Sequence, residues 1–143
     1  MRPLLIELQP KPVVLEGIKV LADRFRRRRM ANSMVVQAYG SRELRAMPSD
    51  VLDFLRHHSF VHLTHCGLGG PFYNCIWSRG RPVKPQIWVD EFPAFGGLDD
   101  LVGLPTSMVY LVEVYGYGSQ IRVYTNDFMR YAAPHPLTSF VAP

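Results

Sequence analysis

The segment at residues 109–128, VYLVEVYGYGSQIRVYTNDF, predicts two β-strands that are joined by a tight turn. Residues 109–115 and 121–125 are rich in β-branched and aromatic side chains, which favour strands. Gly116 and Gly118 supply turn conformations that other residues resist. Shorter strands and short helices are predicted elsewhere, so we expect an α+β fold with a small mixed β-sheet.

The chain is expected to comprise three regions. Residues 1–30 are predicted to form a β lead-in, with strands at 4–8 and 13–20, followed by a basic linker. Residues 31–130 are predicted to form one compact α+β domain. Prolines near both ends indicate extended N- and C-terminal tails, the second at residues 131–143. Hydrophobic residues make up 48% of the chain and charged residues 20%, which are values of globular rather than disordered proteins.

Two short helices are predicted within the domain. Ser41 is expected to cap the first helix, which Pro48 ends, and Ser49 is expected to cap the second. Short strands are predicted at residues 34–38, 60–63, 76–78 and 86–90, and a turn at residues 79–82. No stretch reaches the roughly 18 to 20 apolar residues that a membrane-spanning helix needs, so we expect no transmembrane helix.

Basic residues are concentrated in one run. Residues 1–60 contain 11 Lys and Arg against 6 Asp and Glu, whereas residues 61–143 contain 5 against 6. The run consists of Arg24, Arg26, Arg27, Arg28 and Arg29. It could contact anionic lipid head groups, an acidic protein surface or nucleic acid phosphates, and a solvated basic linker is the alternative. Because the sequence contains no recognised nucleic-acid-binding module, it does not favour nucleic acid as the partner.

The densest group of side chains that could bind a metal is made up of His57, His58, His62, His65 and Cys66. A single helix through this segment would place His58, His62 and His65 on one face, as zinc or copper ligands. The strand that we expect at residues 60–63 would instead point His62 and His65 to opposite faces. The sequence therefore predicts no metal site.

No motif predicts a catalytic centre. The acidic pairs at residues 90–91 and 99–100 are each contiguous, so neither pair would converge by itself as acid and base or as calcium ligands. The glycines at 67–70 are not followed by the Lys-Ser or Lys-Thr of a phosphate-binding loop. A Cys66 nucleophile needs a base that the fold orients, and His65 is only its neighbour in sequence. We therefore expect a noncatalytic protein without a cofactor.

Three aromatic residues, Phe92, Phe95 and Tyr117, are expected to contact a protein partner, together with the arginine run. Aromatic side chains provide a large contact area, and they are enriched in protein–protein interfaces. Strand alternation buries some of the tyrosines in the hairpin, so not every aromatic residue can be exposed. The sequence therefore predicts a protein-binding module.

Several motifs occur in an order that is typical of one protein family. A short helix at 50–55 is followed by an Arg-Gly strand at 78–80 and by a strand at 87–90 that ends in Val-Asp. An acidic helical turn and the two strands of the hairpin come next. This order resembles the plug domain of TonB-dependent outer-membrane receptors, over about residues 13–130.

The resemblance extends upstream and also has departures. Residues 15–24 resemble the linker that contains the TonB box in such receptors, and residues 4–15 resemble the last strand of a carboxypeptidase-regulatory-like domain. Glu91 stands where the family usually has a glycine after the aspartate. Tyr117 replaces the arginine or proline that is expected near the turn.

The resemblance implies a location on the periplasmic face of a bacterial membrane. An oxidising environment there would favour a disulfide between Cys66 and Cys75, whereas in a reducing compartment both residues would remain thiols. No signal peptide is recognisable in the sequence, so the cytoplasmic side of the membrane stays open as the alternative.

The transmembrane barrel that follows the plug in these receptors is absent from the sequence, which ends at Pro143. We therefore expect an accessory or adaptor subunit that binds a larger membrane protein complex. The host could be a transporter, a secretion machine or a photosynthetic reaction-centre and antenna complex. The alternative is a plug fragment of a TonB-dependent transporter that gates substrate uptake.

Overall fold

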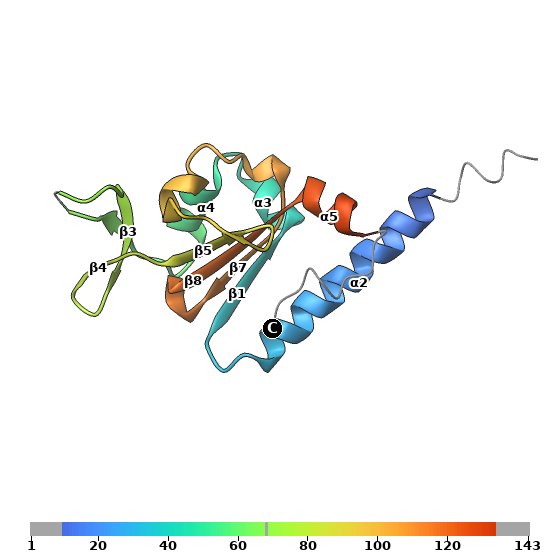
Figure 1. The fold of residues 1–143 in the computed structure, drawn as a ribbon, viewed down its shortest axis with the longest axis horizontal. Coiled ribbons are helices and arrows are strands. Elements are labelled where there is room, and N and C mark those ends of the chain that lie inside the picture. The colour runs from blue at the N-terminus through green and yellow to red at the C-terminus, as the bar shows by residue number, and fades with distance from the viewer. Residues whose placement is uncertain (1–9, 68, 134–143) are drawn as a thin grey trace, which may run out of the picture. The chain divides into compact units, whose positions relative to one another are not determined.

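A computed structural model of the chain describes residues 10–67 and 69–133. The protein has the mixed α+β fold that the sequence predicts, and its elements form two compact units (Figure 1). The first unit contains the described residues before Met34 together with those after Thr125, and the second extends from Met34 to Thr125. No helix in the described part of the chain is long and apolar enough to cross a membrane.

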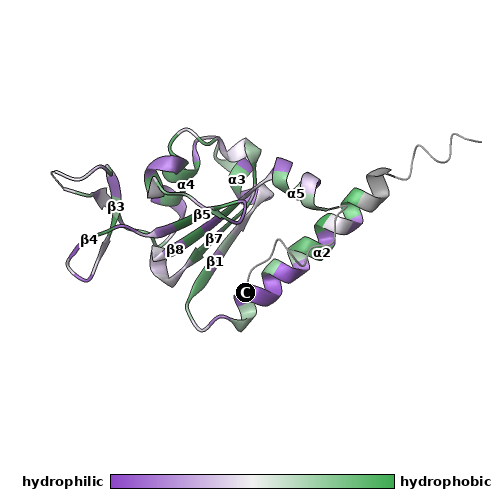
Figure 2. Ribbon diagram, viewed as in Figure 1, coloured by the Kyte–Doolittle hydropathy of each residue, from purple (hydrophilic) through white to green (hydrophobic). Residues whose placement is uncertain are grey.

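The first unit is built from two helices. Helix α2 (Pro10–Ala31) packs against helix α5 (Asn126–Ala132). Leu21 and Phe25 are fully buried and lie four residues apart, so they share one face of α2. The C-terminal part of α2 is hydrophilic (Figure 2), because it contains the arginine run.

Residues 13–20 belong to α2, so the strand predicted there is wrong. The prediction followed the β-branched residues of this stretch, but Leu15, Glu16 and Lys19 between them are strong helix formers. A helix of this length also gains most of its stability from packing one face, here the face of Leu21 and Phe25. The arginine run is likewise helical rather than a linker. The strand predicted at 4–8 lies outside the described residues.

The predicted C-terminal tail is also corrected in part. Tyr131 and Ala132 are the last residues of α5 and are not extended, because the helix buries Met129 and Ala132. Residues 134–143 lie outside the described residues, as does the expected N-terminal tail at residues 1–9.

The second unit contains two β-sheets (Figure 1). The larger sheet has the strand order β1-β7-β8-β5-β6, formed by β1 (Val36–Gly40), β7 (Val109–Tyr115), β8 (Gln120–Thr125), β5 (Gln86–Val89) and β6 (Phe92–Pro93). The larger sheet is mixed, because β5 and β8 pair in parallel while the other three pairs of neighbouring strands are antiparallel. The smaller, antiparallel sheet has the order β2-β3-β4, formed by β2 (Leu63–His65), β3 (Asn74–Ser78) and β4 (Arg81–Val83).

The predicted hairpin at residues 109–125 is confirmed as β7 and β8. Val112 and Val123 are register partners and are fully buried, as are most of the other apolar residues of the two strands. The central strands of the larger sheet are accordingly largely hydrophobic (Figure 2). The strand predicted at 60–63 starts later, at Leu63, and Arg81 and Pro82 belong to β4 rather than to a turn.

Short helices cover one face of the larger sheet and complete the core. They are α3 (Ser41–Ala46), α4 (Val51–His58) and the 3₁₀ helices η1 (Gly97–Leu101) and η2 (Thr106–Met108). Leu44, Phe54 and Leu98 from three of them pack in one buried cluster with Val112 and Ile121 of the sheet. The main hydrophobic core of the second unit therefore lies between the sheet and these helices.

The helix caps differ by one residue from the predicted ones. The N–H of Gly40 donates to the Glu43 carboxylate at 3.0 Å, so Ser41 is the first helical residue of α3 and not its cap. Asp50 caps α4, since its carboxylate accepts a hydrogen bond from the N–H of Asp53 at 2.7 Å. The hydroxyl of Ser49 instead donates to a backbone carbonyl at 3.1 Å.

The turn between β7 and β8 is a tight one, η3 (Gly116–Gly118), whose three residues all have positive φ. The φ of Gly118 is 107°, and a Cβ at this position would lie 3.0 Å from the side chain of Val61. Gly118 is therefore required both by the backbone conformation and by the close approach of Val61.

We expect Gly118→Ala to destabilise the protein more than Gly103→Ala. Both positions have positive φ, which costs about 1 to 2 kcal/mol for alanine. The surroundings of Gly103 are open, whereas the contact with Val61 should add about 1 to 3 kcal/mol at residue 118. Urea denaturation of both variants measures the difference, and equal losses would show that the contact with Val61 has no energetic effect.

Candidate functional site

A groove of about 920 Å³ lies where the two sheets of the second unit meet. Three segments line it: residues 59–62 between α4 and β2, the β3–β4 hairpin, and the turn between β7 and β8. One aromatic residue from each of these segments borders the groove, and they are Phe60, Trp77 and Tyr117. We call this site the aromatic groove.

The aromatic residues of the groove are more than half exposed. The exposed fraction is 58% for Phe60, 52% for Trp77 and 58% for Tyr117. The ring centroids of Phe60 and Tyr117 are 6.2 Å apart, so these two residues form a continuous apolar surface. Contiguous exposed apolar surface in a concave region is typical of a binding site rather than of ordinary protein surface.

Hydrogen bonds and backbone conformation fix the position of each aromatic residue. The N–H of Phe60 donates to the side chain of Gln37 at 3.1 Å, and the N–H of Trp77 donates to the carbonyl of His62 at 2.8 Å. Tyr117 has a φ of 59°, in the left-handed region, and lies between two glycines that also have positive φ. The backbone at Phe60 and at Trp77 is therefore held by hydrogen bonds to other segments of the second unit.

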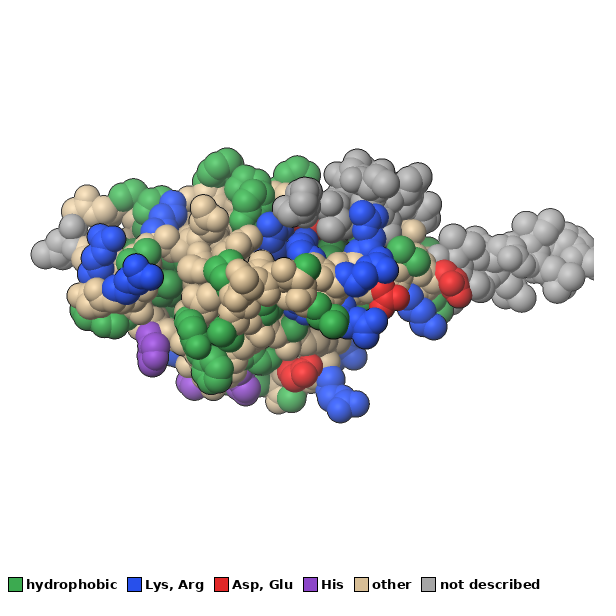
Figure 3. All heavy atoms as spheres, turned by 90° about the horizontal axis from the view of Figure 1, so that it is seen from below, with side chains coloured by type: hydrophobic (Ala, Val, Ile, Leu, Met, Phe, Trp, Pro, Cys, Tyr) green, Lys and Arg blue, Asp and Glu red, His purple; other side chains and the backbone are tan. Residues whose placement is uncertain are grey.

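The charged side chains at the groove are basic. Arg79 and Arg81 line it from the β3–β4 hairpin, and both are exposed. Neither arginine forms an ion pair with any described residue, and no acidic side chain lines the groove. Figure 3 shows hydrophobic and basic side chains together at the left of the view, which is the side where the β3–β4 hairpin lies in Figure 1. The acidic side chains that are visible in Figure 3 lie away from this side.

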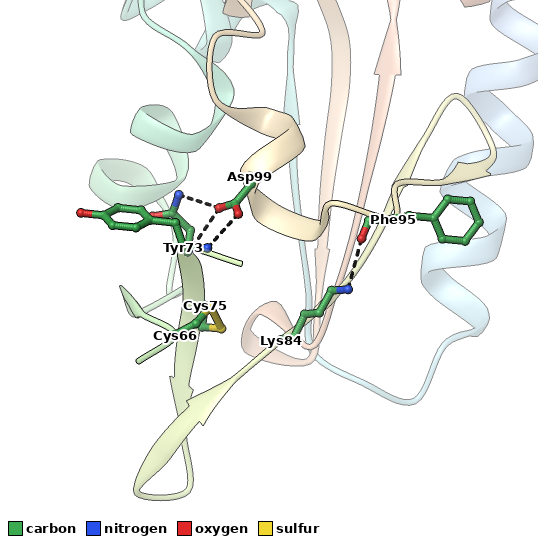
Figure 4. The surroundings of a disulfide bond; sticks show 7 residues. Cys66, Tyr73, Cys75, Lys84, Phe95 and Asp99 are labelled. Atoms are coloured by element: carbon green, nitrogen blue, oxygen red, sulfur yellow. Dashed lines mark hydrogen bonds between the residues drawn. A yellow bond between two sulfur atoms is a disulfide. The ribbon is translucent and has the colours of Figure 1, made fainter. Parts of the chain in front are cut away.

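A disulfide joins Cys66 and Cys75 at the opposite end of β3 (Figure 4). This is the pair for which the resemblance favoured a disulfide. It closes the loop between β2 and β3, and the N–H of Cys66 also donates to the carbonyl of Tyr73 at 3.0 Å. The bond therefore fixes the two strands of the smaller sheet to each other next to the groove wall.

Asp99 of η1 attaches this loop to the rest of the second unit (Figure 4). Its carboxylate accepts hydrogen bonds from the N–H of Tyr73 at 2.8 Å and from the N–H and side-chain amide of Asn74 at 2.9 Å each. Nearby, the ammonium of Lys84 lies 3.5 Å from the centroid of the Phe72 ring and donates to the carbonyl of Phe95 at 3.2 Å. The smaller sheet is thus held through polar contacts at the end remote from Arg79.

A second polar cluster lies at the C-terminal ends of β5 and β8. The carboxylate of Glu91 accepts hydrogen bonds from Arg122 at 2.9 Å and from the hydroxyl of Tyr124 at 3.0 Å. Asp90 accepts from the N–H and hydroxyl of Thr125 at 2.7 and 2.8 Å. Both oxygens of Glu91 accept a hydrogen bond from β8, so this cluster connects the two parallel strands.

The residues predicted to contact a partner belong to different elements. Tyr117 lines the aromatic groove, but Phe92 and Phe95 lie on β6 and the loop that follows it, outside the groove lining. Their exposed fractions are 72% and 82%. The arginine run is part of α2 in the first unit, where Arg26 and Arg27 are exposed.

The groove residues Phe60, Trp77, Arg79 and Arg81 were not predicted from the sequence. The Ser-Arg-Gly-Arg turn could have indicated an exposed basic hairpin tip, because turns lie at the protein surface. In the hairpin Trp77 pairs with Pro82 and Ser78 with Arg81, so Trp77 and Arg81 lie on opposite faces of the strand pair. Phe60 carries no such signal, because its place in the groove depends on contacts that are distant in sequence.

The histidines and Cys66 do not form a metal site in the described residues, where no three metal-binding side chains converge. The His58 ring stacks on Phe54 at a centroid distance of 4.6 Å, and the His65 ring packs against Tyr73 at 4.5 Å. His62 lines the aromatic groove. His58 and His65 therefore make ring contacts in separate places, and His62 borders the groove.

No protein-family model, no curated protein and no solved structure matches the chain. The resemblance to the plug domain therefore stays a prediction that rests on the order of the motifs. The candidate site rests on the geometry of the aromatic groove.

The contribution of Asp99 to stability should depend on pH. Burial by itself raises the pKa of this carboxyl group. Hydrogen bonds from Tyr73 and Asn74 and the charge of Lys84 together lower the pKa by more, so the net pKa lies below the ordinary 3.8. A lowered folded-state pKa stabilises the protein above pH 3.8, and this stabilisation is lost as the pH falls through the folded-state pKa.

Urea denaturation of the wild type and of Asp99→Asn at a series of pH values measures this effect. At neutral pH we expect the variant to be less stable by about 1 to 3 kcal/mol, because an amide cannot accept every hydrogen bond that the carboxylate accepts. The difference should shrink as the solution becomes more acidic than the ordinary pKa. A difference that is constant with pH would contradict the assignment.

Proposed function

We propose that the chain is a noncatalytic protein-binding module that acts as an accessory or adaptor subunit of a larger membrane-associated assembly. The observation that carries the proposal is the aromatic groove, in which three exposed aromatic residues from separate segments border one concave surface. Aromatic residues that line a concave surface are the typical anchors of protein interfaces, where a few residues supply most of the binding energy.

The fixed backbone of the groove supports this role. The contacts of Phe60 with Gln37 and of Trp77 with His62 hold the aromatic residues in place before a partner binds. Binding then costs less conformational entropy than it would if loops had to become ordered. A preformed groove of this kind suits the recognition of a protein segment.

A membrane-associated host is proposed from the plug resemblance together with two structural features. Disulfides persist in oxidising compartments such as the periplasm, which fits the bond between Cys66 and Cys75. The exposed Arg26 and Arg27 of α2 could contact anionic lipid head groups or an acidic surface of the complex. These features support the periplasmic face of a membrane as the place of action.

The second candidate is a plug fragment of a TonB-dependent transporter, and one observation favours it. Glu91 has a φ of 70° and Asp90 a φ of 52°, both in the left-handed region. The family usually has glycine at the position of Glu91, and glycine is the residue that adopts this conformation without strain. The genomic sequence downstream of Pro143 tests this candidate, which requires an in-frame barrel.

Co-purification tests the first candidate. A tagged chain is expressed in its native cells, and the proteins retained from the solubilised membrane fraction are quantified by mass spectrometry. We expect the double variant Phe60→Ala/Trp77→Ala to recover its partner with about tenfold lower yield, because it removes two central aromatic contacts.

The matched control is Val102→Ala/Met108→Ala, which truncates two apolar residues outside the groove with exposed fractions of 54% and 48%. It should recover the partner at the wild-type level. Because the substituted side chains are exposed, all of these proteins should keep the wild-type melting temperature. Equal recovery by both double variants, or no association with membrane proteins, would contradict the proposal.

A further inference from the structure

The aromatic groove combines apolar surface with uncompensated positive charge. Arg79 and Arg81 are exposed, have no ion-pair partner among the described residues, and line the same groove as Trp77. From this combination, and resting on the proposed protein-binding function, we propose that the groove binds an acidic peptide segment of the partner, with an aromatic or aliphatic side chain between carboxylates.

Charge complementarity favours carboxylates over other polar groups. A guanidinium presents several N–H donors in a planar fork, which matches the two oxygens of a carboxylate. An acidic segment would meet two guanidinium groups and no opposing acidic side chain in the lining. The aromatic rings of Phe60 and Tyr117 would then receive the apolar side chain between the acids.

The backbone of the hairpin indicates that side chains, rather than strand addition, hold the peptide. β4 is an edge strand of the smaller sheet, so its outer edge is open to pairing with another strand. The N–H of Trp77 points to the β2 side, where it donates to His62. Pro82 is the register partner of Trp77, so the backbone polar groups of Pro82 must point away from β3, toward the outer edge of β4. Proline has no N–H, so this position offers no hydrogen-bond donor to an added strand.

A nucleic acid strand is the competing ligand, because single strands also use arginine and aromatic residues. Such proteins combine stacking platforms with a track of cations along the backbone of the strand. The aromatic groove has two arginines, both on one hairpin, and no such track among its lining residues. Its charge distribution therefore suits a short acidic peptide better.

Fluorescence anisotropy with labelled peptides tests the proposal. The probe contains Glu-Glu-Phe-Glu-Glu flanked by glycines, and the comparison peptides carry Gln-Gln-Phe-Gln-Gln or Glu-Glu-Ala-Glu-Glu. We expect the acidic aromatic probe to bind about tenfold more tightly than either comparison peptide. Its affinity should fall as the salt concentration rises from about 50 mM to about 500 mM. A thymidine oligonucleotide of about ten nucleotides serves as the competing ligand.

Two charge-reversal variants locate the site. Arg79→Glu/Arg81→Glu should weaken binding of the acidic probe by about tenfold or more. Arg42→Glu/Arg45→Glu reverses the same number of exposed charges on α3, outside the groove, and should stay within about twofold of the wild type. In NMR spectra of the labelled protein, the amide signals of residues 59–62, 76–83 and 116–119 should shift when the probe binds.

Each other outcome overturns the proposal. Equal binding of the glutamine peptide, equal effects of the two charge reversals, or tighter binding of the oligonucleotide would each do so. The co-purification assay separates the two levels of inference. If Phe60→Ala/Trp77→Ala loses the partner but Arg79→Glu/Arg81→Glu retains it, the protein-binding function stands and the acidic ligand is wrong. If both variants retain the partner, both proposals fail.

Discussion

Strand β8 is the element on which the second unit depends, because it pairs with β7 on one side and with β5 on the other. Its alternate residues Ile121 and Val123 are fully buried in the core beneath the short helices. Its C-terminal end holds Asp90 through Thr125, and its N-terminal end forms the tight turn with β7. The turn presents Tyr117 at the groove, so the pairing that builds the sheet also positions part of the candidate site.

The aromatic groove exists because the smaller sheet is held next to this turn. The disulfide of Cys66 and Cys75 and the hydrogen bonds of Asp99 act at one end of β3, while Trp77 and the arginines lie at the other. Val61 packs against Gly118 and brings the segment of Phe60 to the turn. Local contacts of different chemical kinds thus support one surface. The same arrangement leaves aromatic side chains exposed beside basic ones.

Some features of the sequence were sufficient for prediction and others were not. The hairpin of β7 and β8 was predicted correctly because its strand propensity, alternation and glycine turn all agree. Residues 13–20 were predicted wrongly because their β-branched side chains favour strands locally, whereas the buried face of Leu21 and Phe25 stabilises a helix. The cap of α4 was misplaced by one residue, since only the structure shows whether Ser49 or Asp50 accepts the hydrogen bond.

By itself, the sequence determined the α+β class, the central hairpin and the presence of exposed aromatic and basic residues, because these follow from propensities and patterns over a few neighbouring positions. Tertiary structure alone decided which of these residues meet. Tyr117 lies with Phe60 and Trp77, whereas Phe92 and Phe95 lie outside the groove lining. The physical reason is that a binding surface is assembled by strand register and packing between distant segments, which no local pattern encodes.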